Sequence, residues 1–265
     1  MLLEDKTAVI YGGGGAIGGA VARVFAREGA RVFLAGRTQA KLDQVVRDIT
    51  NDGGTAESSI VDALDQLSVA GHVEHVVRRA GRIDVALNAV GIPHVQGPPL
   101  AELTLADFAL PITSYMRTNF LTAKAVASHM QAQGSGVILT LSTPGSQMAG
   151  VGFLGYGVTC GAVETFSRIL SGEVGGDGVR VVCLRPHAIP ESIATSHVRE
   201  VFGPVAMRAG MSIQDWLAGL AQGDTLLGRL PTLVEVAEYA ALVASDRASA
   251  MTGAIVNINC GSLVG

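Results

Sequence analysis

A predicted strand that runs straight into four glycines and then into a helix constrains this chain more than any other stretch. Residues 7–11 are apolar and predict a buried strand, residues 12–15 are all glycine, and a helical pattern follows. Glycines let backbone N–H groups approach a phosphate, and the positive end of the helix dipole faces it. The G-x-G-x-x-G pattern fits at Gly13, Gly15 and Gly18. The stretch therefore predicts a cradle for the phosphates of a dinucleotide.

Length and composition narrow the class of protein. The 265 residues suit one large α/β domain with enough chain for a sizeable core. Charged residues make up 16% of the chain, below the usual share of roughly 25%, which indicates extensive burial. The net charge of −4 argues against a nucleic-acid partner, because such proteins normally show a basic patch.

Targeting signals and cysteines point to a compartment. The acidic start of the chain does not resemble a signal peptide, and no apolar run approaches the ~20 residues that a membrane helix needs. Cys160, Cys183 and Cys260 are widely spaced and odd in number, which favours free thiols in a reducing environment. We therefore expect a cytoplasmic protein without a membrane partner.

Apolar strands alternate with helical segments along the whole chain. The predicted strands are 7–11, 30–36, 57–63, 83–91, 136–141, 179–184 and 254–259. The predicted helices are 16–26, 39–50, 66–80, 104–133 with a break or bend near Pro111, 156–170 and 233–244. This alternation predicts a single-domain Rossmann fold of the α/β class, a doubly wound parallel sheet flanked by helices. Residues 187–229 interrupt the rhythm, and we expect them to form a lid over a substrate.

Two further features bear on bound groups. The second strand ends at Gly36-Arg37, where an NAD-binding unit places an acid for the ribose 2′-hydroxyl. A neutral residue followed by Arg37 suits a 2′-phosphate instead, so we expect NADP, with NAD as the alternative. His72 and His75 share a helix, but no further ligands cluster with them, so we expect surface histidines and no metal site.

In their order and spacing these motifs resemble the short-chain dehydrogenase/reductase family over nearly the whole chain. The glycine turn resembles that family's T-G-x-x-x-G-x-G, with Tyr11 in place of Thr and Ala16 in place of the middle Gly, and residues 87–91 resemble its N-N-A-G. The resemblance implies a homo-oligomer, a dimer or tetramer. The cofactor-binding residues that it implies are Gly12, Gly14, Gly15, Ile17, Gly18, Arg37, Asp62, Ala63, Asn88, Ala89, Gly91, Pro186 and Ile189.

The family's catalytic signature, Tyr-x-x-x-Lys, is changed in this chain to Tyr156-x-x-x-Cys160. In that family the lysine favours the phenolate of the tyrosine and binds the nicotinamide ribose. Without a nearby cation, a phenol with a pKa near 10 is a poor base at neutral pH. We expect Cys160 to be buried and neutral, packing as a small hydrophobe, with a reactive thiol as the alternative.

The resemblance also implies roles for the remaining catalytic residues. Tyr156 would be the acid or base, and Asn119 would support a water in a proton relay. Thr143, thirteen positions before the tyrosine, would donate a hydrogen bond to the substrate oxygen, and the neighbouring Ser142 is the alternative donor.

The lost lysine leaves the chemistry open. We hypothesise that Arg185 or His187 supplies the missing positive charge, because both flank Pro186 at the end of a predicted strand. The leading interpretation is an NAD(P)-dependent oxidoreductase that moves a hydride between nicotinamide and a carbonyl or alcohol of a hydrophobic small molecule. The alternatives are a protein that binds NADP(H) or a partner without turnover, and a different reaction on the same scaffold.

Overall fold

A single seven-stranded parallel sheet organises the computed structural model, which describes residues 1–264. Its strand order is β3-β2-β1-β4-β5-β6-β7, and every neighbouring pair is parallel. The strands are β1 (Thr7–Tyr11), β2 (Arg31–Gly36), β3 (Thr55–Ile60), β4 (Val85–Asn88), β5 (Gly136–Leu141), β6 (Val179–Pro186) and β7 (Ile255–Ile258).

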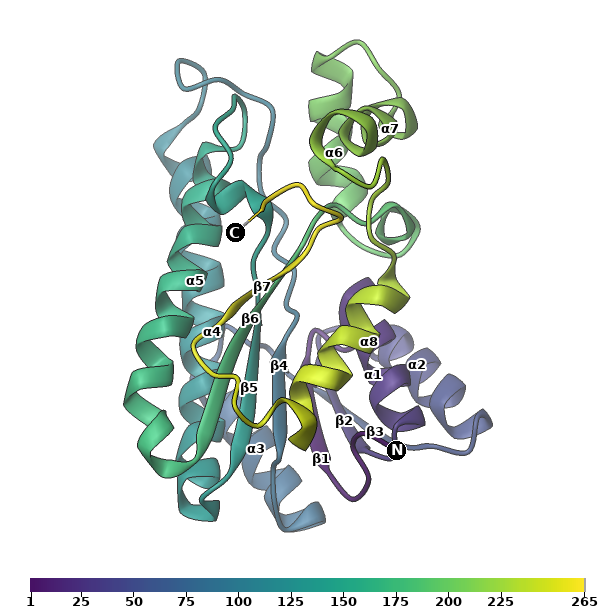
Figure 1. Ribbon diagram of the computed structural model, residues 1–265, viewed down its shortest axis with the longest axis vertical. Helices are drawn as coiled ribbons and strands as arrows, with labels where there is room; N and C mark the ends of the chain where they lie inside the picture. The colour runs from purple at the N-terminus through teal and green to yellow at the C-terminus, as the bar shows by residue number, and fades with distance from the viewer. Residues whose placement is uncertain (265) are drawn as a thin grey trace.

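Helices cover both faces of the sheet. They are α1 (Ala16–Arg27), α2 (Gln39–Asn51), α3 (Gln66–Ala80), α4 (Leu105–Gln133), α5 (Leu154–Val174), α6 (Val198–Arg208), α7 (Ile213–Asp224) and α8 (Leu233–Ala244). Figure 1 shows α4 and α5 along one side of the sheet and α1 and α8 along the other. The predicted Rossmann fold is confirmed.

Strand periodicity explains why two separate cores form. Successive side chains of a strand point to opposite faces, and in β1 Ile10 packs in the core beneath α1, α2 and α8, whereas Val9 packs in the core beneath α3 and α4. Both faces are apolar because both are covered, which is the usual condition of a parallel sheet. Because all seven strands are parallel, their carboxyl ends lie along one edge of the sheet, where ligands bind in such folds.

The segment between β6 and α8 builds its own small cluster. A short 3₁₀ helix (Pro190–Ala194) leads into α6 and α7, and Ile193, Leu217 and Leu230 are buried together, apart from the two sheet cores. In Figure 1, α6 and α7 lie together beyond the upper end of the sheet. Residues 187–229, where the alternation of strands and helices was expected to be interrupted, thus contain a 3₁₀ helix, α6 and α7 and no strand between β6 and α8.

Some predicted boundaries were wrong. β3 begins and ends earlier than predicted, so Asp62 follows the strand instead of ending it, and β4 is only the central part of the predicted strand 83–91. A break or bend was predicted near Pro111, and the helix is not broken there: α4 continues through this buried residue, although proline removes one backbone hydrogen bond.

The prediction of two surface histidines on α3 was wrong for His72, which is only 4% exposed. Its position, three residues after Val69 and four before Val76, places it on the apolar face of the helix. The His72 ring meets Tyr11 edge to face at 5.6 Å. Within residues 1–264, no three or more His, Cys, Asp or Glu side chains come together as a group that could hold a metal ion, and none of the helices is long and apolar enough to cross a membrane.

Candidate active site

The glycine turn leaves the first N–H groups of α1 available to a ligand. Gly15 is the N-cap, and neither a capping side chain nor an acidic residue occupies the first turn in this described part of the chain. Gly12 has a φ of +78°, which favours glycine, and a Cβ there would lie 2.4 Å from the oxygen of Ala89. A Cβ at Gly18 would lie 2.3 Å from the oxygen of Gly12. Such a turn fits the pyrophosphate of a dinucleotide, because its backbone is held open at a positive helix end.

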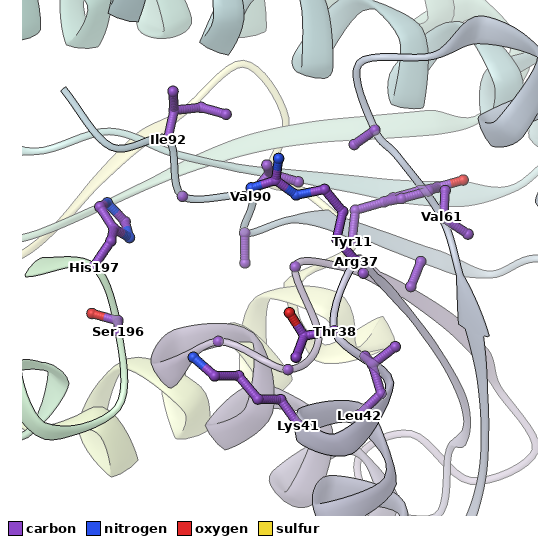
Figure 2. Close-up of a pocket in the computed structure, with 18 of the residues that line it drawn as sticks. Tyr11, Arg37, Thr38, Lys41, Leu42, Val61, Val90, Ile92, Ser196 and His197 are labelled. Carbon is purple, nitrogen blue, oxygen red and sulfur yellow. The ribbon is translucent and has the colours of Figure 1, made fainter.

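A cavity of about 210 Å³ extends from this turn along the ends of β2 and β3. Figure 2 shows the amine of Lys41 reaching across it toward the segment that carries Ser196 and His197. The Lys41 amine donates to the carbonyl of Thr195 over 3.3 Å. The His197 ring lies so close to Gly91 that a Cβ there would fall 2.2 Å from its Cε1. The segment before α6 therefore closes one side of the nucleotide cavity.

The charges around this cavity are mainly positive. Arg37 and Lys41 line it together, whereas Asp62 is the one acid among its lining residues. Arg37 is exposed, and it has no hydrogen bond or ion pair to any other described residue. The Asp62 carboxylate accepts the backbone N–H of Leu64 over 2.9 Å. The end of the cavity beside β2 can therefore hold an anionic group.

A second and larger cavity, about 310 Å³, adjoins the first and shares Gly15, Ala89 and Gly91 with it. Its outer wall is apolar and comes from the loop before α5 and from α6 and α7. The side chains of this apolar wall are Met148, Phe153, Val201, Phe202, Trp216 and Leu220. The two cavities together have the form of a nucleotide site that leads into an apolar substrate site.

Tyr156 and Thr143 line the second cavity, and the buried Cys160 lies behind them. The Thr143 Oγ1 lies 3.2 Å from the Cys160 Sγ, and Cys160 is 2% exposed. Burial raises the pKa of Tyr156 well above its usual value, and the neighbouring Cys160 and Tyr115 add to that effect. Burial also raises the pKa of Cys160 to about 11. Both groups therefore hold their protons at neutral pH, and Cys160 is neutral and buried as expected.

Ser142 and Thr143 differ in their hydrogen-bond partners. The Ser142 hydroxyl is buried and donates to Glu164 over 2.8 Å, so its proton is already used. The Thr143 hydroxyl instead lies beside the Tyr156 phenol, where it offsets a small part of the rise in the pKa of Tyr156 that burial causes. Of the two predicted alternatives, Thr143 is the hydroxyl beside the tyrosine.

Arg185 forms a buried ion pair with Glu164. Its Nε and Nη2 donate to the two carboxylate oxygens over 2.8 and 2.7 Å, and its Nη1 donates to Asn257 over 3.0 Å. Burial alone would raise the pKa of Glu164, but hydrogen bonds from Arg185 and Ser142 hold that pKa below its usual value. The guanidinium charge is therefore committed to Glu164, which argues against the hypothesis that Arg185 supplies a cation to Tyr156.

His187, unlike Arg185, lines the second cavity. Its Nδ1 accepts the N–H of Ala188 over 2.6 Å, so its proton is on Nε2, which is buried without a partner among the described residues. Burial lowers the pKa of His187, while Asp224 opposes that shift. A neutral imidazole does not provide the hypothesised positive charge.

Two buried amides shape the floor of the cavity. Asn119 donates from Nδ2 to the carbonyl of Tyr115 over 2.9 Å, and its Oδ1 is buried without a partner within residues 1–264. Asn88 donates to Thr122 over 3.2 Å and accepts the N–H of Val90 over 3.1 Å. Asn88 therefore fixes the turn after β4, and Asn119 offers an acceptor to a polar ligand or water.

His94 and Gln96 line this cavity as well, although neither was predicted as a site residue. The His94 ring stacks on Tyr156 with centroids 4.4 Å apart and 15° between the planes. Its Nδ1 donates to the carbonyl of Ile92 over 2.7 Å, and its Nε2 lies 2.9 Å from the amide nitrogen of Gln96. Polar residues just after the end of β4 were the available signal, since that end of a parallel strand faces the ligand edge.

The structure brings the predicted site residues together around the two cavities. Gly18 is the exception, because it lines neither cavity and instead lets α1 approach the turn. Lining the nucleotide cavity are Gly12, Gly14, Gly15, Arg37, Asp62, Ala63, Ala89 and Gly91. Lining the second cavity are Ile17, Asn88, Asn119, Ser142, Thr143, Tyr156, Pro186 and Ile189. The roles of these residues stay predictions.

Comparisons with known proteins agree with this geometry. The family model described as Enoyl-(Acyl carrier protein) reductase matches residues 14–262. The uncharacterized oxidoreductase YxbG of Bacillus subtilis is 30% identical over 254 residues, covering 95% of this chain and 88% of its own length. A 7alpha-hydroxysteroid dehydrogenase of Clostridium sardiniense is 26% identical and covers 99% of this chain and 95% of its own. The crystal structure of an NAD⁺-bound xylitol dehydrogenase superposes with a TM-score of 0.90 at 23% identity, covering 98% of this chain and 100% of its own.

Proposed function

The chain belongs to the short-chain dehydrogenase/reductase family of nicotinamide-dependent oxidoreductases, and from that premise we propose that it reduces a carbonyl group of an apolar small molecule with NADPH. The observation that carries this proposal is the meeting of Tyr156 and Thr143 inside an apolar cavity that opens onto the nucleotide cavity. A carbonyl oxygen placed there would find a hydroxyl donor and a phenol at the same point.

The reduced nicotinamide, when bound, supplies a hydride to the substrate carbon. Thr143 and Tyr156 then stabilise the charge that develops on the substrate oxygen, and Tyr156 delivers its proton to that oxygen. A tyrosine that keeps its proton is a competent acid and a poor base. Because Tyr156 holds its proton at neutral pH, it can donate that proton to the alkoxide formed in reduction, whereas alcohol oxidation requires the phenol to lose its proton first.

The preference for NADP rests on Arg37 and Lys41. Both side chains border the nucleotide cavity at the end of β2, and Arg37 is without a partner in the described chain. Charged hydrogen bonds of this kind contribute about 1.5–3 kcal/mol each. NADP as the cofactor is therefore part of the proposal, with NAD as the alternative.

An apolar substrate, and a lid over it, fit the segment 187–229. Phe202, Trp216 and Leu220 of that segment form much of the apolar wall, and His197 packs on Gly91 at the junction of the cavities. The relative named as a hydroxysteroid dehydrogenase is in keeping with an apolar substrate. Opening of this segment would admit the substrate.

We also propose a homo-oligomer and a cytoplasmic location. Phe120 on α4 and Leu154, Val158 and Ile169 on α5 are between 44% and 60% exposed. Because α4 and α5 pack side by side, an apolar face of this kind suits a second copy of the chain. All three cysteines are free, in keeping with a reducing compartment.

The second candidate function is binding of NADP(H) without turnover, and Cys160 is the observation that favours it. In this chain a neutral thiol stands four residues after the tyrosine, and Arg185 is committed to Glu164. A titration of NADPH fluorescence tests both candidates, since failure to bind would remove both. Turnover with a panel of apolar ketones then separates them, with Tyr156→Phe as the control for background reduction.

A further inference from the structure

We propose that Gln96 selects substrates that carry a hydroxyl group in addition to the reacting carbonyl, because its side-chain carbonyl oxygen is a fixed hydrogen-bond acceptor in the substrate cavity. The inference rests on the proposed function, since it concerns the substrate of the same site. It names the substrate class as apolar hydroxy ketones, with the hydroxyl bound at Gln96 and the ketone at Tyr156.

A short chain of hydrogen bonds fixes the orientation of the Gln96 amide. The carbonyl of Ile92 can only accept, so the His94 Nδ1 that lies 2.7 Å away carries a proton. Burial lowers the pKa of His94, so the ring is neutral and its Nε2 has a free lone pair. That Nε2 lies 2.9 Å from the Gln96 nitrogen, which therefore donates to it. The opposite amide orientation would place two acceptors against each other.

The consequence is an acceptor oxygen without a protein partner. Gln96 is 8% exposed and lines the substrate cavity. No hydrogen bond within residues 1–264 reaches its carbonyl oxygen, which is not among the fully buried unpartnered atoms and so remains accessible. An accessible acceptor on a nearly buried side chain is satisfied by a ligand that donates.

The surroundings make this acceptor selective. Met148, Phe153 and Trp216 are apolar parts of the same cavity, so a ligand that covers Gln96 with a hydrocarbon leaves a desolvated acceptor unpaired. Such a loss costs about 1–3 kcal/mol, whereas a ligand hydroxyl restores the hydrogen bond. A ligand that places a second carbonyl or an ether oxygen beside Gln96 would put two acceptors against each other, and we expect it to bind more weakly.

The loop that carries this pair is held in place at both ends. The Gly97 N–H donates to the carbonyl of Gly152 over 2.6 Å, which ties the loop after β4 to the loop before α5. The stack of His94 on Tyr156 ties the same loop to the catalytic tyrosine. The acceptor therefore has a defined position relative to the phenol, and the preference should depend on where the ligand carries its hydroxyl.

Binding is measured separately from turnover. The chain has one tryptophan, and because Trp216 lines the cavity, its fluorescence reports ligand binding. The protein is saturated with NADP⁺, which cannot reduce the ketone group, and each titration is monitored for NADPH formation, because a hydroxyl group is open to oxidation by NADP⁺. The probes are methyl hexyl ketone and its monohydroxy derivatives, with the hydroxyl moved along the chain one carbon at a time. At least one derivative should bind about tenfold more tightly than the parent ketone.

Substitution of Gln96 tests the assignment. In Gln96→Leu, and in Gln96→Met if the leucine variant does not fold, the preference should fall to about one or invert. His94→Phe keeps an aromatic ring beside Tyr156 but removes the acceptor that orients Gln96, and it should weaken the preference. The exposed Gln44→Leu on α2 is the matched control and should keep it.

The inference is overturned if no hydroxy derivative binds more tightly than the parent, or if both Gln96 variants keep the wild-type preference. Reduction of the parent ketone by NADPH reports on the proposed function by itself. A preference for binding the hydroxy ketones without any reduction of the parent ketone would therefore contradict the proposed function and support the role of Gln96. Reduction without a preference would do the reverse.

Discussion

Replacing Arg185 with methionine should lower the free energy of unfolding by about 3–5 kcal/mol, because it leaves a buried carboxylate without its positively charged partner. Glu164 is 7% exposed and loses hydrogen bonds of 2.8 and 2.7 Å from the guanidinium, while only the Ser142 hydroxyl continues to donate to it. Asn257 loses a further bond of 3.0 Å, worth about 1 kcal/mol. Against a typical stability of about 5–15 kcal/mol, this is a large fraction.

The double variant Arg185→Met/Glu164→Leu separates an ion pair from a simple packing effect. It removes both charges, so the cost of burying them disappears as well, and we expect its stability to lie within about 2 kcal/mol of wild type. Urea unfolding followed by far-ultraviolet circular dichroism measures all three proteins. The reasoning is refuted if Arg185→Met costs less than about 1 kcal/mol, or if the double variant is no more stable than the single one. A stable Arg185→Met that loses turnover would instead revive the idea of a cation for Tyr156.

Three further perturbations test other parts of the structure. Burial lowers the pKa of His72 from about 6.5 to about 4. As the pH falls, this histidine therefore takes up a proton in the unfolded state before it does so in the folded state. The free energy of unfolding of wild type should fall by about 2 kcal/mol between pH 7 and pH 5 through this group. His72→Leu should lose that much less in urea unfolding at the two pH values, and an equal loss would contradict the assignment. Cys160→Lys places an ammonium near Tyr156 and should raise the rate of alcohol oxidation at neutral pH about tenfold for each unit by which the tyrosine pKa falls. An unchanged pH profile of NADPH formation would count against the role of Tyr156. Turnover seen only in this variant would favour a protein that binds NADP(H) without turnover. Arg37→Ser and Lys41→Ser should each weaken NADPH relative to NADH about tenfold or more in fluorescence titrations, and an unchanged ratio would remove the basis for NADP.

The order of the elements could be predicted because it depends on local patterns. The apolar run before Gly12, the glycines themselves and the apolar run that ends at Asn88 each carry a signal within a few residues. Parallel strands then deliver their carboxyl ends to one edge. This is why residues from Gly12 to Pro186, far apart in the chain, could be assigned to one edge of the sheet before their contacts were known, whereas the roles of the individual residues were implied by the family resemblance.

The parts that could not be predicted depend on partners from elsewhere in the chain. His72 looked like a surface histidine because a helix pattern does not say how wide its buried face is. Ser142 and Thr143 are neighbours with the same chemistry, and the partner Glu164 on α5 is what distinguishes them. The orientation of Gln96 follows from the tautomer of His94, which a single carbonyl contact decides.

The central claim is that the protein transfers a hydride to a carbonyl group bound in the apolar cavity, with Tyr156 as the acid, although a cysteine replaces the family's lysine four residues after this tyrosine. The most direct measurement is the transfer of deuterium from NADPH that carries deuterium at both positions of nicotinamide C4 to an apolar hydroxy ketone, followed by mass spectrometry of the product. We expect one deuterium on the new carbinol carbon with wild type, and at least about a hundredfold slower transfer with Tyr156→Phe. Absence of deuterium from the product of the wild-type protein, or equal transfer in the two proteins, would contradict the account.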